Sequence, residues 1–242
     1  MTAGLFDLPA PLFGWADERL NALLPAPAAI VLWAFLGGIA AIEIYRLASP
    51  QRQIARAKRD AGEAQRRLAG FDGEFGDAWP LMRRMLGVSL KRVALVVPGT
   101  LLAAYPVVAL LLWLDSDYGH RWPRLDEAVA VTVPAPWQGR WNHAEAGQPP
   151  RVTAHNPGGE PAFEVPFHAP VPVVHKRRWW NALAANPAGY LHPGAPVEEV
   201  RVELPRREIV AAGPAWARGW EPLFLAALTL AALAYKRLRG VH

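Results

Sequence analysis

The sequence predicts an α-helical membrane protein with three transmembrane helices, a cytoplasmic helical hairpin of the coiled-coil type, and a small all-β domain outside the membrane. Three observations predict this fold class. Two long runs carry no charged residue, a basic stretch with a heptad repeat lies between them, and a proline-rich region with short alternating segments follows. The chain has 242 residues and no cysteine, so disulfide bonds play no part in this fold.

Two uncharged runs are long enough to cross a bilayer. One covers 23 positions from Leu20 to Ile42, and the other covers 22 positions from Val93 to Leu114. A bilayer core about 30 Å thick needs roughly 20 residues of helix. The sequence therefore predicts transmembrane helices over residues 20–47 and 93–114.

A third apolar run covers only 14 residues, from 222 to 235. At about 1.5 Å per residue, a helix of this length is shorter than the bilayer core. Trp216 and Trp220 precede the run and three cations follow it, which is the arrangement of interfacial anchors around a span. We expect a third transmembrane helix here, and a buried soluble helix is the alternative.

The distribution of Lys and Arg predicts the orientation in the membrane. The 47 residues from 46 to 92 hold 11 of these cations, whereas residues 1–19 hold one and the tail 236–242 holds three. Short basic loops stay in the cytoplasm, and long translocated domains are largely exempt from this rule. We therefore expect residues 1–19 and 115–221 outside and the tail inside, in a bacterial inner membrane.

The loop between the first two spans predicts an antiparallel helical hairpin over residues 49–92. A glycine-rich turn at 70–76 separates two helical segments, and the second segment runs into the span at 93–114. The first segment has apolar residues at alternating spacings of three and four, which is a coiled-coil seam. Because its seam is rich in alanine, the hairpin buries little apolar area and should be only marginally stable alone. The seam residues are Ile54, Ala57, Ala61, Ala64, Leu68 and Phe71.

Residues 115–221 predict a small β domain. They contain 15 of the 24 prolines and several short strand-like runs, "AVAVTV", "RVTAH" and "PVVH" among them. The clearest strand is 200–204, in which Val200, Val202 and Leu204 share one face. Prolines restricted to loops and strand edges favour a sandwich-like domain of about 100 residues.

Two external segments have the composition of a membrane interface. Residues 1–19 mix apolar side chains with few charges, and both an interfacial segment and an ordinary loop fit this pattern. A second segment combines cations with adjacent tryptophans, which suits the headgroup zone of a bilayer. Structural packing or a surface for an anionic glycan or partner is the alternative for this basic-aromatic patch, which consists of Lys176, Arg177, Arg178, Trp179 and Trp180.

Four polar residues of the first two spans are candidates for a hydrophilic groove: Glu43, Arg46, Thr100 and Tyr105. Glu43 and Arg46 are three residues apart on one helix face, and ionisable groups in a membrane helix usually face a partner or a wet cavity. Because both residues lie close to the membrane boundary, the alternative is that their side chains simply extend into water. Thr100 and Tyr105 lie near two prolines that free backbone carbonyls. The span at 93–114 therefore either lines a cavity, or it contains prolines without any functional reason.

No catalytic or metal-binding pattern is visible in the sequence. The histidines are scattered, the three serines lie outside any nucleophile motif, and there is no glycine-rich phosphate loop. We therefore expect no enzyme activity, no cofactor, no metal site and no nucleic-acid partner.

The order of segments resembles the three-helix core of the YidC/Oxa/Get superfamily of membrane-protein insertases, especially its short relatives, with an extra external β domain. The likeness rests on the architecture of residues 27–114 and 222–239, including "SPQRQIARAKRDAGEAQRRLAGF". Members of that superfamily lower the cost of moving polar segments across the bilayer with a hydrophilic groove. The resemblance implies that Arg46 is the groove cation and that the hairpin from Gln51 to Arg92 receives the client.

Two functions follow from these expectations. In the first, the protein is an insertase-like chaperone that helps polar or weakly hydrophobic segments of membrane-protein clients to enter the bilayer. In the second, it is a non-catalytic subunit of a cell-envelope complex, with fixed partners docked on the β domain and the hairpin. An external hydrolase tethered by helices is the weakest alternative because no catalytic set is present.

Overall fold

A computed structural model describes residues 3–73, 75–145 and 147–239 of the chain. Five α-helices and six β-strands lie within these residues. The chain divides into two compact units, which we call the β unit and the hairpin unit. The β unit consists of residues 1–34 and 108–227, and the hairpin unit consists of residues 35–107 and 228–242. Three of the helices contribute residues to both units.

The helix predicted over residues 20–47 corresponds to α2 (Ala26–Ala48). A separate helix, α1 (Ala10–Asn21), precedes it and ends just inside the predicted range. The break falls at Pro25, whose carbonyl accepts a hydrogen bond of 2.9 Å from the amide of Ala28 at the start of α2. Proline fits the beginning of a helix, where its missing N–H has no partner to lose, whereas in a helix interior it removes one backbone hydrogen bond. The first apolar helix therefore begins several residues later than predicted.

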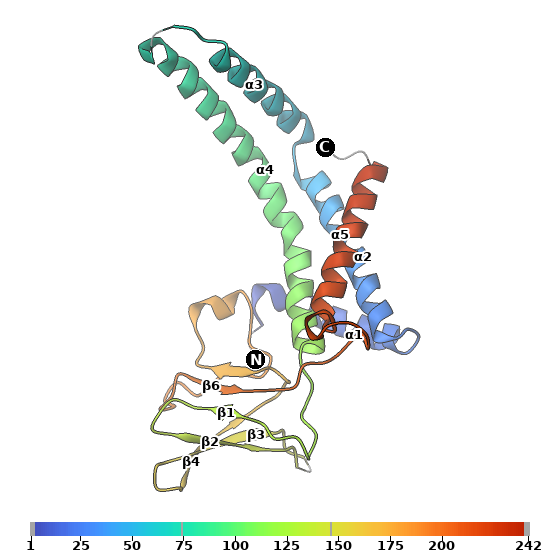
Figure 1. Cartoon of the computed structure of the whole chain (residues 1–242), viewed down its shortest axis with the longest axis vertical. Coiled ribbons are helices and arrows are strands. Elements are labelled where there is room, and N and C mark those ends of the chain that lie inside the picture. Colours follow the sequence, from blue (N-terminus) through green and yellow to red (C-terminus); the bar gives the residue numbers. More distant parts are fainter. Residues whose placement is uncertain (1–2, 74, 146, 240–242) are drawn as a thin grey trace. The chain divides into compact units, whose positions relative to one another are not determined.

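The hairpin unit contains α3 (Gln51–Ala69) and the first part of α4 (Phe75–Tyr118), which run antiparallel (Figure 1). Helix α4 is 44 residues long, so the return arm of the hairpin and the predicted span at 93–114 form one continuous helix. It continues through three internal prolines, Pro80, Pro98 and Pro106.

The predicted seam lies on the less exposed face of α3. Ala57 and Ala64 are buried, with 3% and 6% of their surface exposed, and the other four seam residues are half-buried. Most of the charged side chains between them are exposed. Close to the base of the hairpin, Gly99 of α4 faces Ser49, and a Cβ added to Gly99 would collide with the Ser49 hydroxyl oxygen. The absence of a side chain at Gly99 therefore permits the close approach.

Helix α5 (Trp220–Arg239) is 20 residues long and exceeds the 14 residues predicted for the third span. In the hairpin unit it packs against α2 at Gly38. A Cβ added to Gly38 would lie 3.4 Å from Leu228 Cδ1 and 3.6 Å from Ala231 Cβ. Small residues at such points let two helices pack closely, which is common in membrane proteins.

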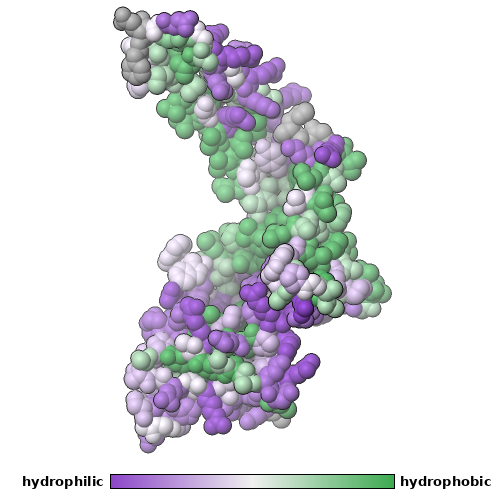
Figure 2. Space-filling view, viewed as in Figure 1, coloured by the Kyte–Doolittle hydropathy of each residue, from purple (hydrophilic) through white to green (hydrophobic). Residues whose placement is uncertain are grey.

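Two described helices are long and apolar enough to cross a membrane: α2, and α4 from Ala78 to Tyr118. Helix α5 has a length of about 30 Å but carries charges near both ends. It does not meet the same criterion of length and composition. Hydrophobic residues gather on α2, α4 and α5, whereas α3 and the strands have a more hydrophilic surface (Figure 2). Length and composition thus make α2 and α4 candidate spans.

The β unit contains two three-stranded antiparallel sheets. The order in the first is β1-β6-β5, and the order in the second is β2-β3-β4. The strands are β1 (Val131–Thr132), β2 (Gln138–Asn142), β3 (Arg151–His155), β4 (Pro161–Pro166), β5 (Val173–His175) and β6 (Glu199–Val202).

One hydrophobic core joins the two sheets. Val152 and Val165 come from the second sheet, and Val174, Val200 and Val202 come from the first. All five are at most 4% exposed. The predicted inward face of the strand at 200–204 is confirmed, because Val200, Val202 and Leu204 lie in this core, but the strand itself ends at Val202. Strands β2 and β4 were not predicted, since one lacks a clear apolar alternation and the other is bounded by prolines.

Candidate functional site

The hairpin unit contains an open groove of about 880 Å³ at the base of the hairpin. Its lining comes from the end of α2, from one face of α3 and from α4. Five of the lining residues are cations and none is acidic. We call this cavity the basic groove, and its cations are Arg52, Lys58, Arg59, Arg66 and Arg92.

Helical periodicity explains why these cations line one groove. Arg52, Arg59 and Arg66 are seven residues apart, which places them on one side of α3 at successive double turns. Arg92 belongs to α4 and completes the lining from the neighbouring helix. The sequence shows the seven-residue spacing, but only the fold shows that α4 closes the groove.

The cations of the basic groove have no carboxylate partner among the described residues. None of the five takes part in an ion pair there, and the guanidinium groups of Arg59 and Arg66 donate only to carbonyls of their own helix. The groove therefore has a strong positive potential that favours anionic groups.

The groove also has an apolar component and an unsatisfied donor. Ile54, Val96 and Tyr45 are part of its lining. The side-chain Nε2 of Gln51 is buried there without a hydrogen-bond acceptor among the described residues. A buried donor without an acceptor costs about 1–3 kcal/mol. An occupant with oxygen acceptors and an apolar part would match this lining.

Two smaller cavities lie along the hairpin, between α3 and α4. The first has a volume of about 340 Å³ and includes Ala61, Ser89 and Val93 in its lining. The second has a volume of about 100 Å³ and is lined by both signs of charge, including Asp60 and Arg84. The two arms of the hairpin are therefore not packed tightly along their whole length, as expected for a seam rich in alanine.

The structure brings two of the predicted groove residues together. The Arg46 guanidinium donates to the Glu43 carboxylate at 2.6 Å and 3.1 Å. The Tyr235 hydroxyl of α5 donates to the other carboxylate oxygen at 2.5 Å. The sequence did not identify Tyr235, which lies at the end of the predicted third span. Arg46 is thus paired with an anion, whereas the five cations of the basic groove form no ion pair among the described residues.

The other two predicted groove residues lie on α4. The Thr100 hydroxyl donates at 3.1 Å to the carbonyl of Val96 in its own helix, so it does not satisfy the Ala94 carbonyl that Pro98 leaves free. Tyr105 is half-buried. Neither residue lines the basic groove.

The predicted basic-aromatic patch is divided between the end of strand β5 and a short 3-10 helix, η2 (Trp179–Ala182). Lys176 forms an ion pair of 2.8 Å with Glu198, and this hydrogen bond holds the pKa of Glu198 below its ordinary value. The Arg178 guanidinium lies 4.9 Å from the ring centre of Trp180. Trp179 is 81% exposed. Arg177 is also exposed.

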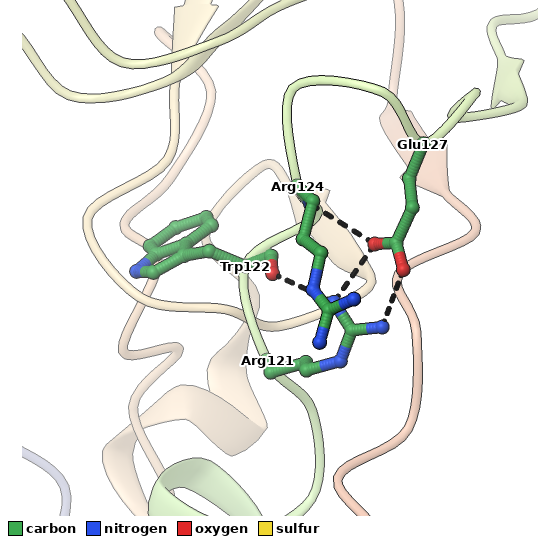
Figure 3. A network of polar contacts seen from close by, with 4 residues as sticks. All are labelled: Arg121, Trp122, Arg124 and Glu127. Atoms are coloured by element: carbon green, nitrogen blue, oxygen red, sulfur yellow. Dashed lines mark hydrogen bonds and ion pairs between the residues drawn. The ribbon is translucent and has the colours of Figure 1, made fainter.

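A group of hydrogen bonds between Arg121, Arg124 and Glu127 stabilises the segment between α4 and the sheets (Figure 3), and we call this group the clasp. The Arg121 guanidinium donates two hydrogen bonds to Glu127, at 2.8 Å and 2.5 Å, and the Arg124 amide donates a third at 3.0 Å. These hydrogen bonds, that of Arg121 above all, lower the pKa of Glu127 to about 2. The intervening Trp122 stacks on Trp141. The clasp is structural and contains no group placed for catalysis.

The described residues contain no group of three or more histidine, cysteine, aspartate or glutamate side chains that could hold a metal ion. His175 of the β unit packs against the rings of Trp180 and Tyr190, and His143 packs against Trp141.

Comparison with protein-family models, with curated proteins and with solved structures finds no match to this chain. The chemistry of the groove itself is therefore the guide to function.

Proposed function

We propose that the protein is an insertase-like membrane chaperone, and that the basic groove at the base of the hairpin receives polar segments of its clients. In this proposal α2, α4 and α5 cross the membrane, the hairpin lies in the cytoplasm and the β domain lies outside. The protein forms no covalent bond to the client and needs no nucleotide, because partition of apolar segments into lipid supplies the free energy.

The observation that supports this proposal is the mixed lining of the basic groove. Five cations without a carboxylate partner among the described residues lie beside Ile54, Val96 and Tyr45, at the point where the apolar part of α2 ends and that of α4 begins. A polar segment in lipid leaves its hydrogen-bonding groups unsatisfied at a cost of several kcal/mol each. A groove open to water that offers donors near the membrane boundary reduces this cost.

The charge of the groove defines the preferred client. Its lining has five cations and no carboxylate, so it favours a segment with Asp or Glu side chains. Arg46 makes a smaller contribution because Glu43 offsets its charge. A short acidic segment next to a transmembrane helix is therefore the expected substrate class.

A reconstituted insertion assay tests this function. The full chain is placed in proteoliposomes, and insertion of a single-span client with a short acidic tail is measured by protease protection. We expect the protein to increase insertion of this client more than insertion of a matched client with a neutral tail. The double variant Arg59→Glu/Arg66→Glu should lose most of this increase.

The control variant is Arg56→Glu/Arg83→Glu, which reverses two exposed cations of the same hairpin outside the three cavities. It should retain the increase. Equal loss in both variants would show that only net charge matters, and unchanged insertion with the wild-type protein would remove the proposal.

Purification in mild detergent separates this function from that of a structural subunit. A varied set of bound membrane proteins supports the chaperone. A single partner in fixed stoichiometry would instead support a subunit of an envelope complex.

A further inference from the structure

We propose that the N-terminal segment and helix η2 form one membrane-docking patch, which holds the β domain against the headgroup region of the bilayer. The patch consists of Leu5, Leu8, Leu12, Trp15, Trp179 and Leu183. This inference concerns the β unit alone, and it depends on the membrane location of the chain but not on insertase activity.

Helix α1 and the turn before it expose an apolar face where a water-facing helix would be polar. Leu8, Leu12 and Trp15 share one face at spacings of four and three residues, and they are 63%, 62% and 59% exposed. The other side of α1 contacts the protein: Asp17 is buried, and the half-buried Phe13 packs against the rings of Trp33 and Trp113. A surface helix in water normally shows polar residues on its outer side. The exposed apolar surface of Leu8, Leu12 and Trp15 therefore suits a lipid environment, and the exposed charges Glu18 and Arg19 follow it toward the end of α1.

Backbone contacts join the N-terminal segment to η2. The Phe6 amide donates to the Leu183 carbonyl at 2.8 Å, and the Ala185 amide donates to the Asp7 carboxylate at 2.6 Å. A Cβ added to Gly4 would lie 2.6 Å from the Leu183 oxygen, so only glycine permits this approach. Two segments separated by 178 residues thus form one continuous surface.

A buried polar network fixes α1 at the ends of the apolar helices. The Asp17 carboxylate accepts hydrogen bonds from Trp33 Nε1 at 2.8 Å and from the Tyr118 hydroxyl at 2.6 Å. Tyr118 is the last residue of α4, and Trp33 lies about two turns from the start of α2. Within the β unit, α1 therefore lies where the apolar helices end and where headgroups begin if these helices span a bilayer.

The side chains at the edge of the patch match a headgroup zone. The guanidinium groups of Arg19 and Arg178 lie 5.8 Å and 4.9 Å from the ring centres of Trp15 and Trp180. Tryptophan is enriched at membrane interfaces, and arginine binds phosphate through several donors. A lipid surface offers phosphates beside acyl chains across the whole patch. We therefore assign this surface to lipid rather than to a protein partner.

The chain has no cysteine, so single cysteines can be introduced and labelled without background. The variants Leu12→Cys and Trp179→Cys are labelled with an environment-sensitive fluorophore and reconstituted as full chains into phosphatidylcholine and phosphatidylglycerol vesicles. Vesicles with spin-labelled lipid should quench both probes strongly. The control variant is Glu160→Cys, in the turn between β3 and β4, which should not be quenched.

The aqueous quencher iodide completes the test. A probe at Trp179 that iodide reaches as easily as the probe at Glu160 would show that the patch faces water. A probe protected from both iodide and lipid quenchers would show that protein, for example a second copy of this chain, covers the patch instead of lipid. Either result would overturn the inference.

Discussion

Asp17 is a buried polar group of the β unit with several hydrogen-bond donors around it. Its carboxylate is 3% exposed and accepts hydrogen bonds from side chains of α1, α2 and α4: Asn21, Trp33 and Tyr118. A buried carboxylate persists in a protein only when such donors compensate for its lost hydration. Asp17 therefore links three helices through one side chain.

The variant Asp17→Ala should lower the free energy of unfolding of the β unit by about 3–6 kcal/mol. The physical reason is that two buried donors, Trp33 Nε1 and the Tyr118 hydroxyl, lose their acceptor, and hydrogen bonds to charged groups contribute about 1.5–3 kcal/mol each. Denaturant titration in detergent, followed by tryptophan fluorescence, measures the change. Glu18→Ala, at an exposed position of the same helix, should change the stability little. Equal effects of the two substitutions would contradict this role of Asp17.

Glu127 should make the clasp in the β unit sensitive to acid. Its folded pKa of about 2 lies below the ordinary value of 4.5, so its stabilising effect is present above about pH 4.5 and disappears as the pH falls toward 2. Because Trp122 stacks on Trp141 beside the clasp, near-ultraviolet circular dichroism should change over this range. Glu127→Gln should reduce the pH dependence. An identical acid transition in the variant would assign it to other carboxyl groups.

At the scale of elements, the sequence predicted those parts of the fold that depend on periodicity. The heptad spacing identified the face of α3 that contains the buried Ala57 and Ala64. Alternation identified β6, whose valines lie in the core. Neither signal marks β4, because it is bounded by Pro161 and Pro166. The start of α2 was misplaced because hydropathy alone does not detect a break at Pro25.

The part of the candidate site that the sequence did not show depends on tertiary contacts. Glu43 and Arg46 were predicted as neighbours from their spacing, but Tyr235 reaches them only because α5 packs on α2 in the hairpin unit. In the same way, Arg92 lies beside the cations of α3 only because α4 runs back along α3. Contacts between elements distant in sequence leave no local pattern in one chain.

Two glycines of α4 give a matched test of the packing at the base of the hairpin. A Cβ at Gly87 would have open space around it for 4 Å, whereas a Cβ at Gly99 would meet Ser49. Alanine favours a helix over glycine by about 0.8–1.0 kcal/mol. Gly87→Ala should therefore stabilise the hairpin by roughly that amount, and Gly99→Ala should give no gain or a loss. Thermal unfolding followed by circular dichroism measures both, and equal stabilisation would contradict the packing at Ser49.

The whole molecule combines two chemically different parts in one chain. The hairpin unit has a groove with five cations that lack carboxylate partners among the described residues, and the β unit has a sandwich-like core and an apolar external face. The length and composition of α2 and α4 make them candidate spans. The insertase function requires these helices to place the hairpin in the cytoplasm and the β domain outside.

The orientation is measured most directly by cysteine labelling. The variants Gln65→Cys, on α3, and Glu160→Cys, in the turn between β3 and β4, are expressed separately in bacterial spheroplasts and treated with a membrane-impermeant maleimide. We predict labelling at Glu160 in intact spheroplasts and labelling at Gln65 only after lysis. Labelling at Gln65 in intact spheroplasts, or protection at Glu160, would contradict the proposed orientation and with it the insertase function.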